Sequence, residues 1–213
     1  MRKLILKMSV SIDGFVGGEA GKVDWIFRGT DAVAIAWTVE TVWNASLHIM
    51  GSRTFHDMAA YWPTSSEVFA PPMNRIPKAV FSRRGRATLK GGNTTMALKN
   101  AIRANAEAGR ESVESQPGAE SWADAYVASG DLAEEIATLK AQEGKPIVAH
   151  GGASFARSLV ALGLIDEYHL LVHPVALGKG LALFSDLAAP RSLELMSSTA
   201  FPGGAVAQLY RPA

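Results

Sequence analysis

The chain has no cysteine among its 213 residues, which excludes disulfide scaffolds, zinc ribbons and thiol catalysis. It also lacks an excess of charge of one sign, because 21 Lys and Arg residues stand against 20 Asp and Glu residues. The basic residues are dispersed except for a short cluster at 83–86, so no broad cationic face is available for a nucleic-acid backbone. With 48% hydrophobic residues, the chain has enough apolar material for one globular domain over residues 1–213.

Long apolar runs are also missing. The apolar stretch that begins at Leu4 is interrupted by Lys7 and soon afterwards by Asp13, so it is too short for a signal peptide or a membrane span. We therefore expect a cytoplasmic protein. Two phosphate-binding fingerprints are absent as well, since the chain has no Walker A motif and no G-x-G-x-x-G near its first predicted strand. A nucleotide could bind only through glycines and basic residues distributed over several strands.

The sequence does contain a regular alternation of strand and helix patterns. Short apolar runs predict strands at 4–12, 46–50, 78–81, 122–128 and 147–149. Apolar residues at helical spacing predict helices at 30–45, 55–61, 132–141 and 155–162. Three further strands are expected at 167–175, 192–197 and 206–211. This pattern predicts an α/β fold with parallel strands covered by helices and antiparallel strands at the C-terminus.

Two parts of this pattern are less regular. Residues 84–121 show no clear periodicity apart from an Ala-rich, charged piece at 97–110, so we expect an insertion that carries one helix over the surface. Polar residues near the helix starts are candidate N-caps, with Thr30 or Asp31 for the first helix and Ser129 for the third.

Three of the predicted parallel strands end in residues suited to phosphate groups. The segments that follow them are Gly51-Ser52-Arg53-Thr54, Ser82-Arg83-Arg84 and Gly151-Gly152-Ala153-Ser154. Glycines let the backbone approach an anion, the first N–H groups of a helix attract it, and an arginine can hold it with a fork of donors. Ligands of open α/β sheets gather at the carboxyl ends of strands. Together the three strand ends predict a dinucleotide site.

Several further motifs in the same order and spacing give the chain its resemblance to a known family. They are 9–16 (SVSIDGFV), 24–25 (DW), 49–55 (IMGSRTF), 164–168 (LIDEY) and 174–180 (PVALGKG). The chain resembles the dihydrofolate-reductase-like superfamily, in the branch shared with the reductase domain of bacterial riboflavin biosynthesis. The resemblance covers nearly the whole chain except the insertion. It implies a central, mostly parallel sheet with helices on both faces, NADPH as the cofactor, and hydride transfer to a heterocycle or carbonyl.

Carried over residue by residue, the resemblance assigns a cofactor site. Gly14 and Asp13 line the nicotinamide or substrate edge, and the loop at 15–23 covers the site. The residues assigned to the phosphates and the adenosine end are Gly51, Arg53, Thr54, Ser82, Arg83, Gly151, Gly152, Ala153 and Ser154. Within this set, Ser82 and Arg83 take the 2′-phosphate. Ser52 stands where many relatives have arginine, so part of the phosphate contact would shift to Arg53.

Reduction of a C=N or C=O group also needs a proton. A carboxyl group near the nicotinamide can supply it if burial raises its pKa towards neutrality. Asp31, six residues after Trp25, corresponds to the acidic residue of dihydrofolate reductases, although the same residue could simply cap a helix. Asp13 is a second catalytic candidate, by its place in the site. Asp24 is a third candidate, although it could equally be a loop residue. Trp25 and Trp62 are interpreted as walls of the substrate pocket.

The remaining aromatic residues are interpreted as structural. Trp37 and Trp43 are assigned to the core. His150 ends a buried strand without a second ligand at metal-binding spacing, so no metal is expected. His169 and His173 lie four residues apart on one strand, where they could face a partner or a pocket but could not comfortably share a metal.

The sequence thus predicts an NADPH-dependent reductase whose substrate is a small pterin-, folate- or pyrimidine-like heterocycle or a carbonyl compound. A homodimer is expected from the family resemblance and from the apolar residues at 170–172. Two alternatives stay open. One is the riboflavin-pathway reduction of a ribosylamino-pyrimidine, and the other is a protein that binds NADPH or another nucleotide as a sensor, without turnover.

Overall fold

The computed structural model describes residues 1–90, 103, 106–107, 109 and 114–213. The strands are β1 (Leu4–Ser11), β2 (Phe15–Gly17), β3 (Leu47–Gly51), β4 (Lys78–Phe81), β5 (Tyr126–Ala128), β6 (Ile147–His150), β7 (Glu167–His173), β8 (Leu181–Ala182), β9 (Leu193–Ala200) and β10 (Val206–Pro212). The α-helices are α1 (Ala32–Trp43), α2 (Ser52–Tyr61), α3 (Ala70–Arg75), α5 (Leu132–Ala141) and α6 (Ala153–Ala161). Short 3₁₀ helices are η1 (Glu19–Gly21), η2 (Asp24–Phe27), η3 (Trp62–Thr64), η4 (Gly85–Lys90) and η5 (Ala119–Trp122).

Eight strands form one sheet in the order β5-β4-β3-β6-β1-β7-β10-β9, and β2 pairs separately with β8. The six strands from β5 to β7 run parallel, whereas β10 is antiparallel to both β7 and β9. The carboxyl ends of the parallel strands therefore meet at one edge of the sheet, which we call the carboxyl edge. The topology confirms the predicted mostly parallel sheet with antiparallel C-terminal strands.

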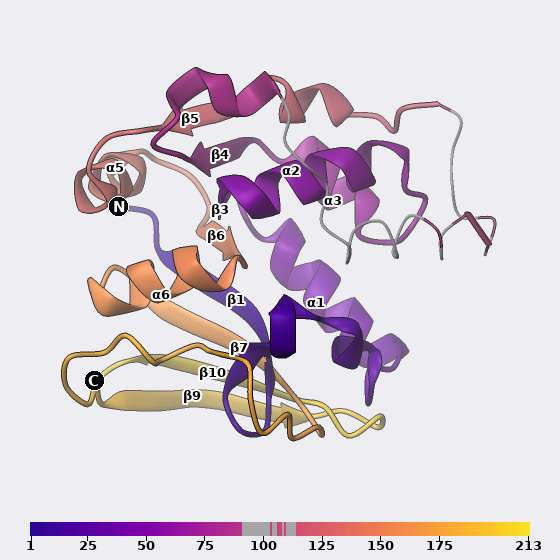
Figure 1. Ribbon diagram of the computed structural model, residues 1–213, viewed down its shortest axis with the longest axis vertical. Helices are drawn as coiled ribbons and strands as arrows, with labels where there is room; N and C mark the ends of the chain where they lie inside the picture. The colour runs from indigo at the N-terminus through magenta and orange to yellow at the C-terminus, as the bar shows by residue number, and fades with distance from the viewer. Residues whose placement is uncertain (91–102, 104–105, 108, 110–113) are drawn as a thin grey trace.

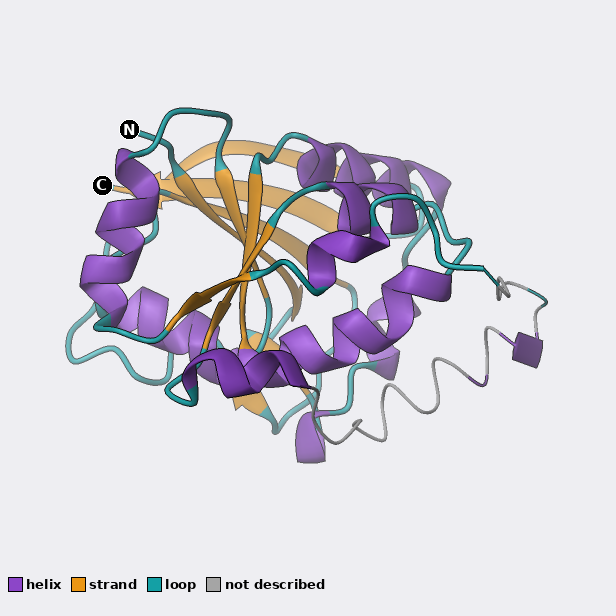
Figure 2. Ribbon diagram, turned by 90° about the horizontal axis from the view of Figure 1, so that it is seen from above, coloured by secondary structure: helices purple, strands orange, loops and turns teal. Residues whose placement is uncertain are grey.

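Helices cover both faces of the sheet (Figures 1 and 2). On one face, Leu4 and Leu6 of β1 belong to a core cluster that includes residues of α5 and α6. On the other face, Met50 and Val80 pack with residues of α1, α2 and α3. Because both faces are buried, the parallel strands consist of nearly continuous apolar runs, and this is why the sequence marked them so clearly.

Two sequence assignments near β5 need correction. Asp131, rather than Ser129, caps α5, because its carboxylate accepts hydrogen bonds from the backbone N–H groups of residues 133 and 134. Trp122 belongs to η5 and not to the strand, which begins at Tyr126. The helix expected at 97–110 falls almost entirely outside the described residues, so the structure does not test it.

Two assignments of buried and exposed residues also differ from expectation. Trp43 is 38% exposed instead of lying in the core, because the side of α1 that faces the sheet carries Ala34, Thr38 and Val42. Leu170 and Leu171 are 6% and 3% exposed, so they are buried within the chain and cannot supply an association surface.

Candidate nucleotide and substrate site

The helices α2 and α6 begin at the carboxyl ends of the neighbouring strands β3 and β6, and both have glycine as N-cap. Neither Gly51 nor Gly152 provides a side chain to bond the first N–H groups of its helix. Those groups therefore face outward with the positive end of the helix dipole, as an anion site requires. The two starts lie close together, since a Cβ on Gly152 would be 2.7 Å from Thr54 Oγ1.

Backbone conformation favours glycine at position 152, and limited space favours it at position 51. Gly152 has a φ of +90°, which residues with a side chain rarely adopt. A Cβ on Gly51 would lie 3.1 Å from the Cβ of Phe155 in α6. The structure thus brings together Gly51, Thr54 and Gly152 from two segments about a hundred residues apart, as the strand-end argument expected.

A cavity of about 580 Å³ lies between the carboxyl ends of β4 and β5 and helix α6. Its lining includes Ser82 and Arg83 after β4, together with Phe155 at the start of α6. The rings of Phe81 and Phe155 are 5.0 Å apart and form an aromatic wall of the cavity. The sequence did not reveal the contribution of residues 128–132 to the lining, because those residues carry no phosphate-binding motif of their own.

The structure also singles out Lys7, which the sequence presented only as an interruption of an apolar strand. Its neighbours in register are His150 of β6 and His169 of β7. Burial lowers the pKa of Lys7 to about 8. Within the described part of the chain, its ammonium group has no hydrogen-bond or ion-pair partner. A half-buried ammonium without a protein partner can bind an electron-rich group of a ligand.

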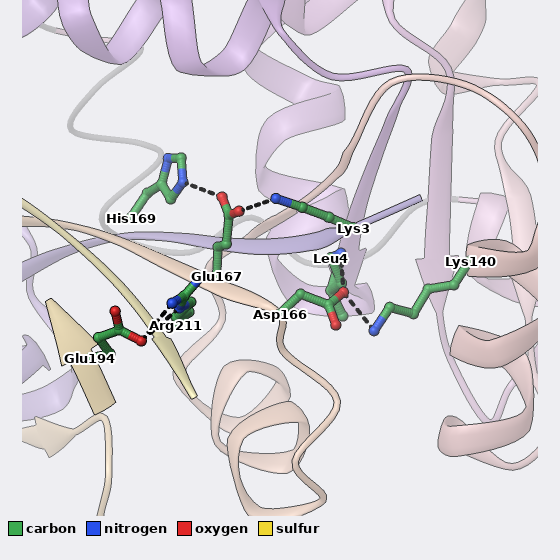
Figure 3. Close-up of polar contacts among 8 residues, drawn as sticks. All are labelled: Lys3, Leu4, Lys140, Asp166, Glu167, His169, Glu194 and Arg211. Atoms are coloured by element: carbon green, nitrogen blue, oxygen red, sulfur yellow. Dashed lines mark hydrogen bonds and ion pairs between the residues drawn. The ribbon is translucent and has the colours of Figure 1, made fainter. Parts of the chain in front are cut away.

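Lys7 is the charged side chain in this part of the sheet, because the nearby histidines are either neutral or already paired. His48 and His150 meet edge to face with ring centroids 4.5 Å apart. Burial, with the nearby positive charges, holds the pKa of His150 well below its usual value and lowers that of His48 to about 3. Both rings are therefore neutral at pH 7. His169 is engaged by Glu167, which also binds Lys3 (Figure 3).

Asp13 lies at the end of β1, where it anchors a distant loop. Its carboxylate accepts hydrogen bonds from the Ser11 hydroxyl and from the backbone N–H groups of Leu177 and Gly178. These bonds lower the pKa of Asp13 to about 2. Gly14 follows with a φ of +84°, and no heavy atom lies within 4 Å of the position that a Cβ would take.

Asp31 has a capping role. Its carboxylate accepts hydrogen bonds from Val33 and Ala34 at the start of α1 and from Gly203 on the β9–β10 connection. These hydrogen bonds, the one from Ala34 foremost, lower the pKa of Asp31. A proton donor at neutral pH needs the opposite shift, so the geometry supports the capping interpretation that the sequence had left open.

The two tryptophans assigned to the pocket lie in different surroundings. Trp25 is only 4% exposed and packs edge-on against His173, with ring centroids 5.5 Å apart. Trp62 sits in an aromatic group with Tyr61 and Phe69 near α2 and α3.

Among the described residues, no cluster of three or more potential ligands could hold a metal ion. The same residues include no helix long and apolar enough to cross a membrane.

The fold and these strand-end features define a class, and comparison with known proteins identifies it. Residues 2–207 match the family model of the RibD C-terminal domain, so the chain belongs to this family. It is 26% identical over 211 residues to the uncharacterized protein YyaP of Bacillus subtilis, covering 98% of this chain and 94% of that protein.

Solved structures agree on the fold. The diaminohydroxyphosphoribosylaminopyrimidine deaminase/5-amino-6-(5-phosphoribosylamino)uracil reductase of Thermotoga maritima matches with a TM-score of 0.63 at 16% identity. The match covers all of this chain and 57% of that enzyme. Dihydrofolate reductase from Enterococcus faecalis, solved with NADP(H), matches with a TM-score of 0.55 at 12% identity, covering 99% of this chain and 96% of that one. These structures confirm the dihydrofolate-reductase-like fold. The family model confirms the branch that the motifs indicated.

Proposed function

We propose that this protein is an NADPH-dependent reductase of a small heterocyclic or carbonyl compound. The observation that carries the proposal is the pair of adjoining helix starts with glycine caps, Gly51 and Gly152, beside a cavity that contains Ser82 and Arg83. The pyrophosphate of a dinucleotide fits the N–H groups of both helices, and the 2′-phosphate fits the serine and arginine. Membership of the RibD C-terminal domain family supports a reductase.

The order of the strands supports one direction for the cofactor along the carboxyl edge. The cavity lies by β4 and β5, the glycine-capped helices follow β3 and β6, and Lys7 is on the adjacent β1. A dinucleotide with its adenosine in the cavity and its pyrophosphate on α2 and α6 would direct its nicotinamide towards β1. Substrate would then lie where Lys7 can reach it.

The cofactor, when bound, supplies the hydride. Lys7 is proposed to hold the acceptor oxygen or nitrogen of the substrate and to deliver the proton that accompanies reduction. A pKa of about 8 keeps the ammonium mostly protonated at neutral pH while making it a better acid than an ordinary lysine. Asp13 contributes by fixing the loop at 177–178 against the end of β1.

The experiment that tests this function follows NADPH absorbance with dihydrofolate, pterins, quinones and pyrimidine ribosides as substrates. We expect steady oxidation with one of them. Lys7→Met should lower kcat by about 10²–10⁴, the usual contribution of a general acid. Because the protonated amine is the active form, kcat of the wild type should fall as pH rises through about 8.

Two results would overturn parts of this proposal. If NADPH quenches tryptophan fluorescence but is never oxidised with any compound, the sensor alternative takes its place. If Lys7→Met turns over like the wild type with an unchanged pH profile, Lys7 is not the proton donor. Preferential turnover of the ribosylamino-pyrimidine would assign the riboflavin-pathway step.

A homodimer is part of the proposal, with β9 as the interface. This strand lies at the edge of the sheet and is exposed along almost its whole length, including Leu195 at 51% and Met196 at 44%. Its single charge, on Glu194, is paired with Arg211 of the same chain. Antiparallel pairing with β9 of a second copy would satisfy its free backbone groups. Sedimentation should give twice the chain mass, and Ser197→Pro should give monomers.

A further inference from the structure

The cavity beside β4 and β5 contains two charged residues that favour different nucleotides. Arg83 follows the end of β4, and Asp131 follows the end of the adjacent β5, just before α5. An arginine suits the 2′-phosphate of NADP(H). A carboxylate instead accepts hydrogen bonds from the free ribose hydroxyls of NAD(H), and it repels a phosphate. The same cavity therefore contains one group suited to each of the two coenzymes.

The N–H groups around the start of α5 are not available to bind a phosphate. Asp131 Oδ1 accepts hydrogen bonds from the N–H groups of residues 133 and 134. Glu135 Oε1 accepts hydrogen bonds from those of residues 129 and 130, and its other oxygen accepts one from the Tyr126 hydroxyl. Four N–H groups on this side of the cavity are thus bound to carboxylates of the chain itself. A phosphate at the start of α5 would therefore be repelled by these carboxylates. At the starts of α2 and α6, by contrast, it would find free N–H donors.

One carboxylate oxygen of Asp131 is free to accept a hydrogen bond from a ligand. Both of its capping hydrogen bonds go to Oδ1, and within the described residues no group bonds Oδ2. Arg83 likewise forms no ion pair with a described residue. Both side chains are exposed and line the cavity, so each is available to a nucleotide.

We infer that Asp131 sets the coenzyme preference of this site by accepting hydrogen bonds from the adenosine ribose, so that both NAD(H) and NADP(H) bind. The inference rests on the proposed function, because it concerns the same nucleotide. Asp131 favours the ribose that carries free hydroxyls, and Arg83 favours the ribose that carries a phosphate. The wild-type preference for NADP(H) is accordingly small, below about tenfold.

The test measures the dissociation constants of NADP⁺ and NAD⁺ by calorimetry for the wild type and for Asp131→Asn. Asparagine caps a helix as well as aspartate, so this variant removes the charge and keeps the cap. We expect NAD⁺ to bind about threefold more weakly and NADP⁺ about threefold more tightly, so the NADP⁺ preference rises about tenfold. The fragments 2′,5′-ADP and 5′-AMP should show the same change without a nicotinamide.

The matched control is Glu143→Gln, which removes one negative charge beyond the exposed C-terminal end of α5. Its preference should equal that of the wild type. A change of less than about twofold in Asp131→Asn, or an equal change in Glu143→Gln, overturns the inference while wild-type binding leaves the proposed function standing. If neither coenzyme binds the wild type, the proposed function itself fails. Asp131→Ser, which also keeps a cap, replaces Asp131→Asn if that variant does not fold.

Discussion

Four helices of eight residues or more begin at the carboxyl edge within the described chain, and they begin in two different ways. Asp31 and Asp131 cap α1 and α5 with carboxylates, whereas α2 and α6 begin at Gly51 and Gly152 without any side-chain cap. An aspartate cap stabilises a helix by about 1 kcal/mol relative to alanine. The chain forgoes such a bond at two adjoining helices, where the N–H groups stay free for an outside anion. The difference in capping thus supports the phosphate site that we propose at the starts of α2 and α6.

The largest effect on NADPH binding is expected when α2 is given a carboxylate cap like those of α1 and α5. Gly51 has an extended backbone that accepts a side chain, although the contact with Phe155 at 3.1 Å is tight. In Gly51→Asp the new carboxylate would bond the free N–H groups and repel the pyrophosphate, so NADPH should bind about 100-fold more weakly. Calorimetry measures this, with Ala189→Asp on an exposed loop as the charge control. Undiminished binding in a folded Gly51→Asp protein would remove α2 from the site.

The next effect concerns the third strand end. Arg83→Ala should weaken the binding of NADPH by about 1.5–3 kcal/mol, which is the range for a hydrogen bond with a charged group. The binding of NADH should be nearly unchanged. The measurement is the dissociation constant of each coenzyme. Arg86→Ala, in the same basic cluster but absent from the cavity lining, is the matched control. An equal loss for both coenzymes would contradict the assignment of Arg83 to the 2′-phosphate.

Removing the Asp31 cap should lower stability and leave cofactor binding unchanged. Asp31→Ala should lower the free energy of unfolding by about 1 kcal/mol, because it removes the cap of α1. Asp31→Asn keeps a cap and should retain kcat within about threefold of the wild type. Thermal unfolding and steady-state rates test both. A loss of more than about a hundredfold in kcat for Asp31→Asn would restore the proton-donor hypothesis.

The smallest expected effect is on acid stability. The pKa of Asp13 is lowered from 3.8 to about 2 by hydrogen bonds, so its ionised form stabilises the folded state. That contribution is fully present above pH 3.8 and is lost as pH falls towards 2. Asp13→Asn should therefore lose less stability than the wild type between these values, as measured by urea unfolding at each pH. Parallel pH curves for the two proteins would refute this contribution.

The sequence predicted the fold well because the parallel strands are buried on both faces and consist of apolar runs bounded by glycine or proline. It also predicted which strand ends meet, since parallel topology brings their carboxyl ends together. It did not reveal Lys7, because the surroundings of this lysine depend on the fold. Its register neighbours, His150 and His169, are adjacent to it in the sheet but distant in sequence. Asp131 was missed for the same reason, since its cavity forms only when β4 and β5 are neighbours.

The most direct test of the account is a crystal structure of the protein with NADP⁺. We expect pyrophosphate oxygens at about 3 Å from the backbone N–H groups at the starts of both α2 and α6, with the 2′-phosphate on Arg83. A pyrophosphate seated at the aspartate-capped starts of α1 or α5, or away from the carboxyl edge altogether, would contradict it.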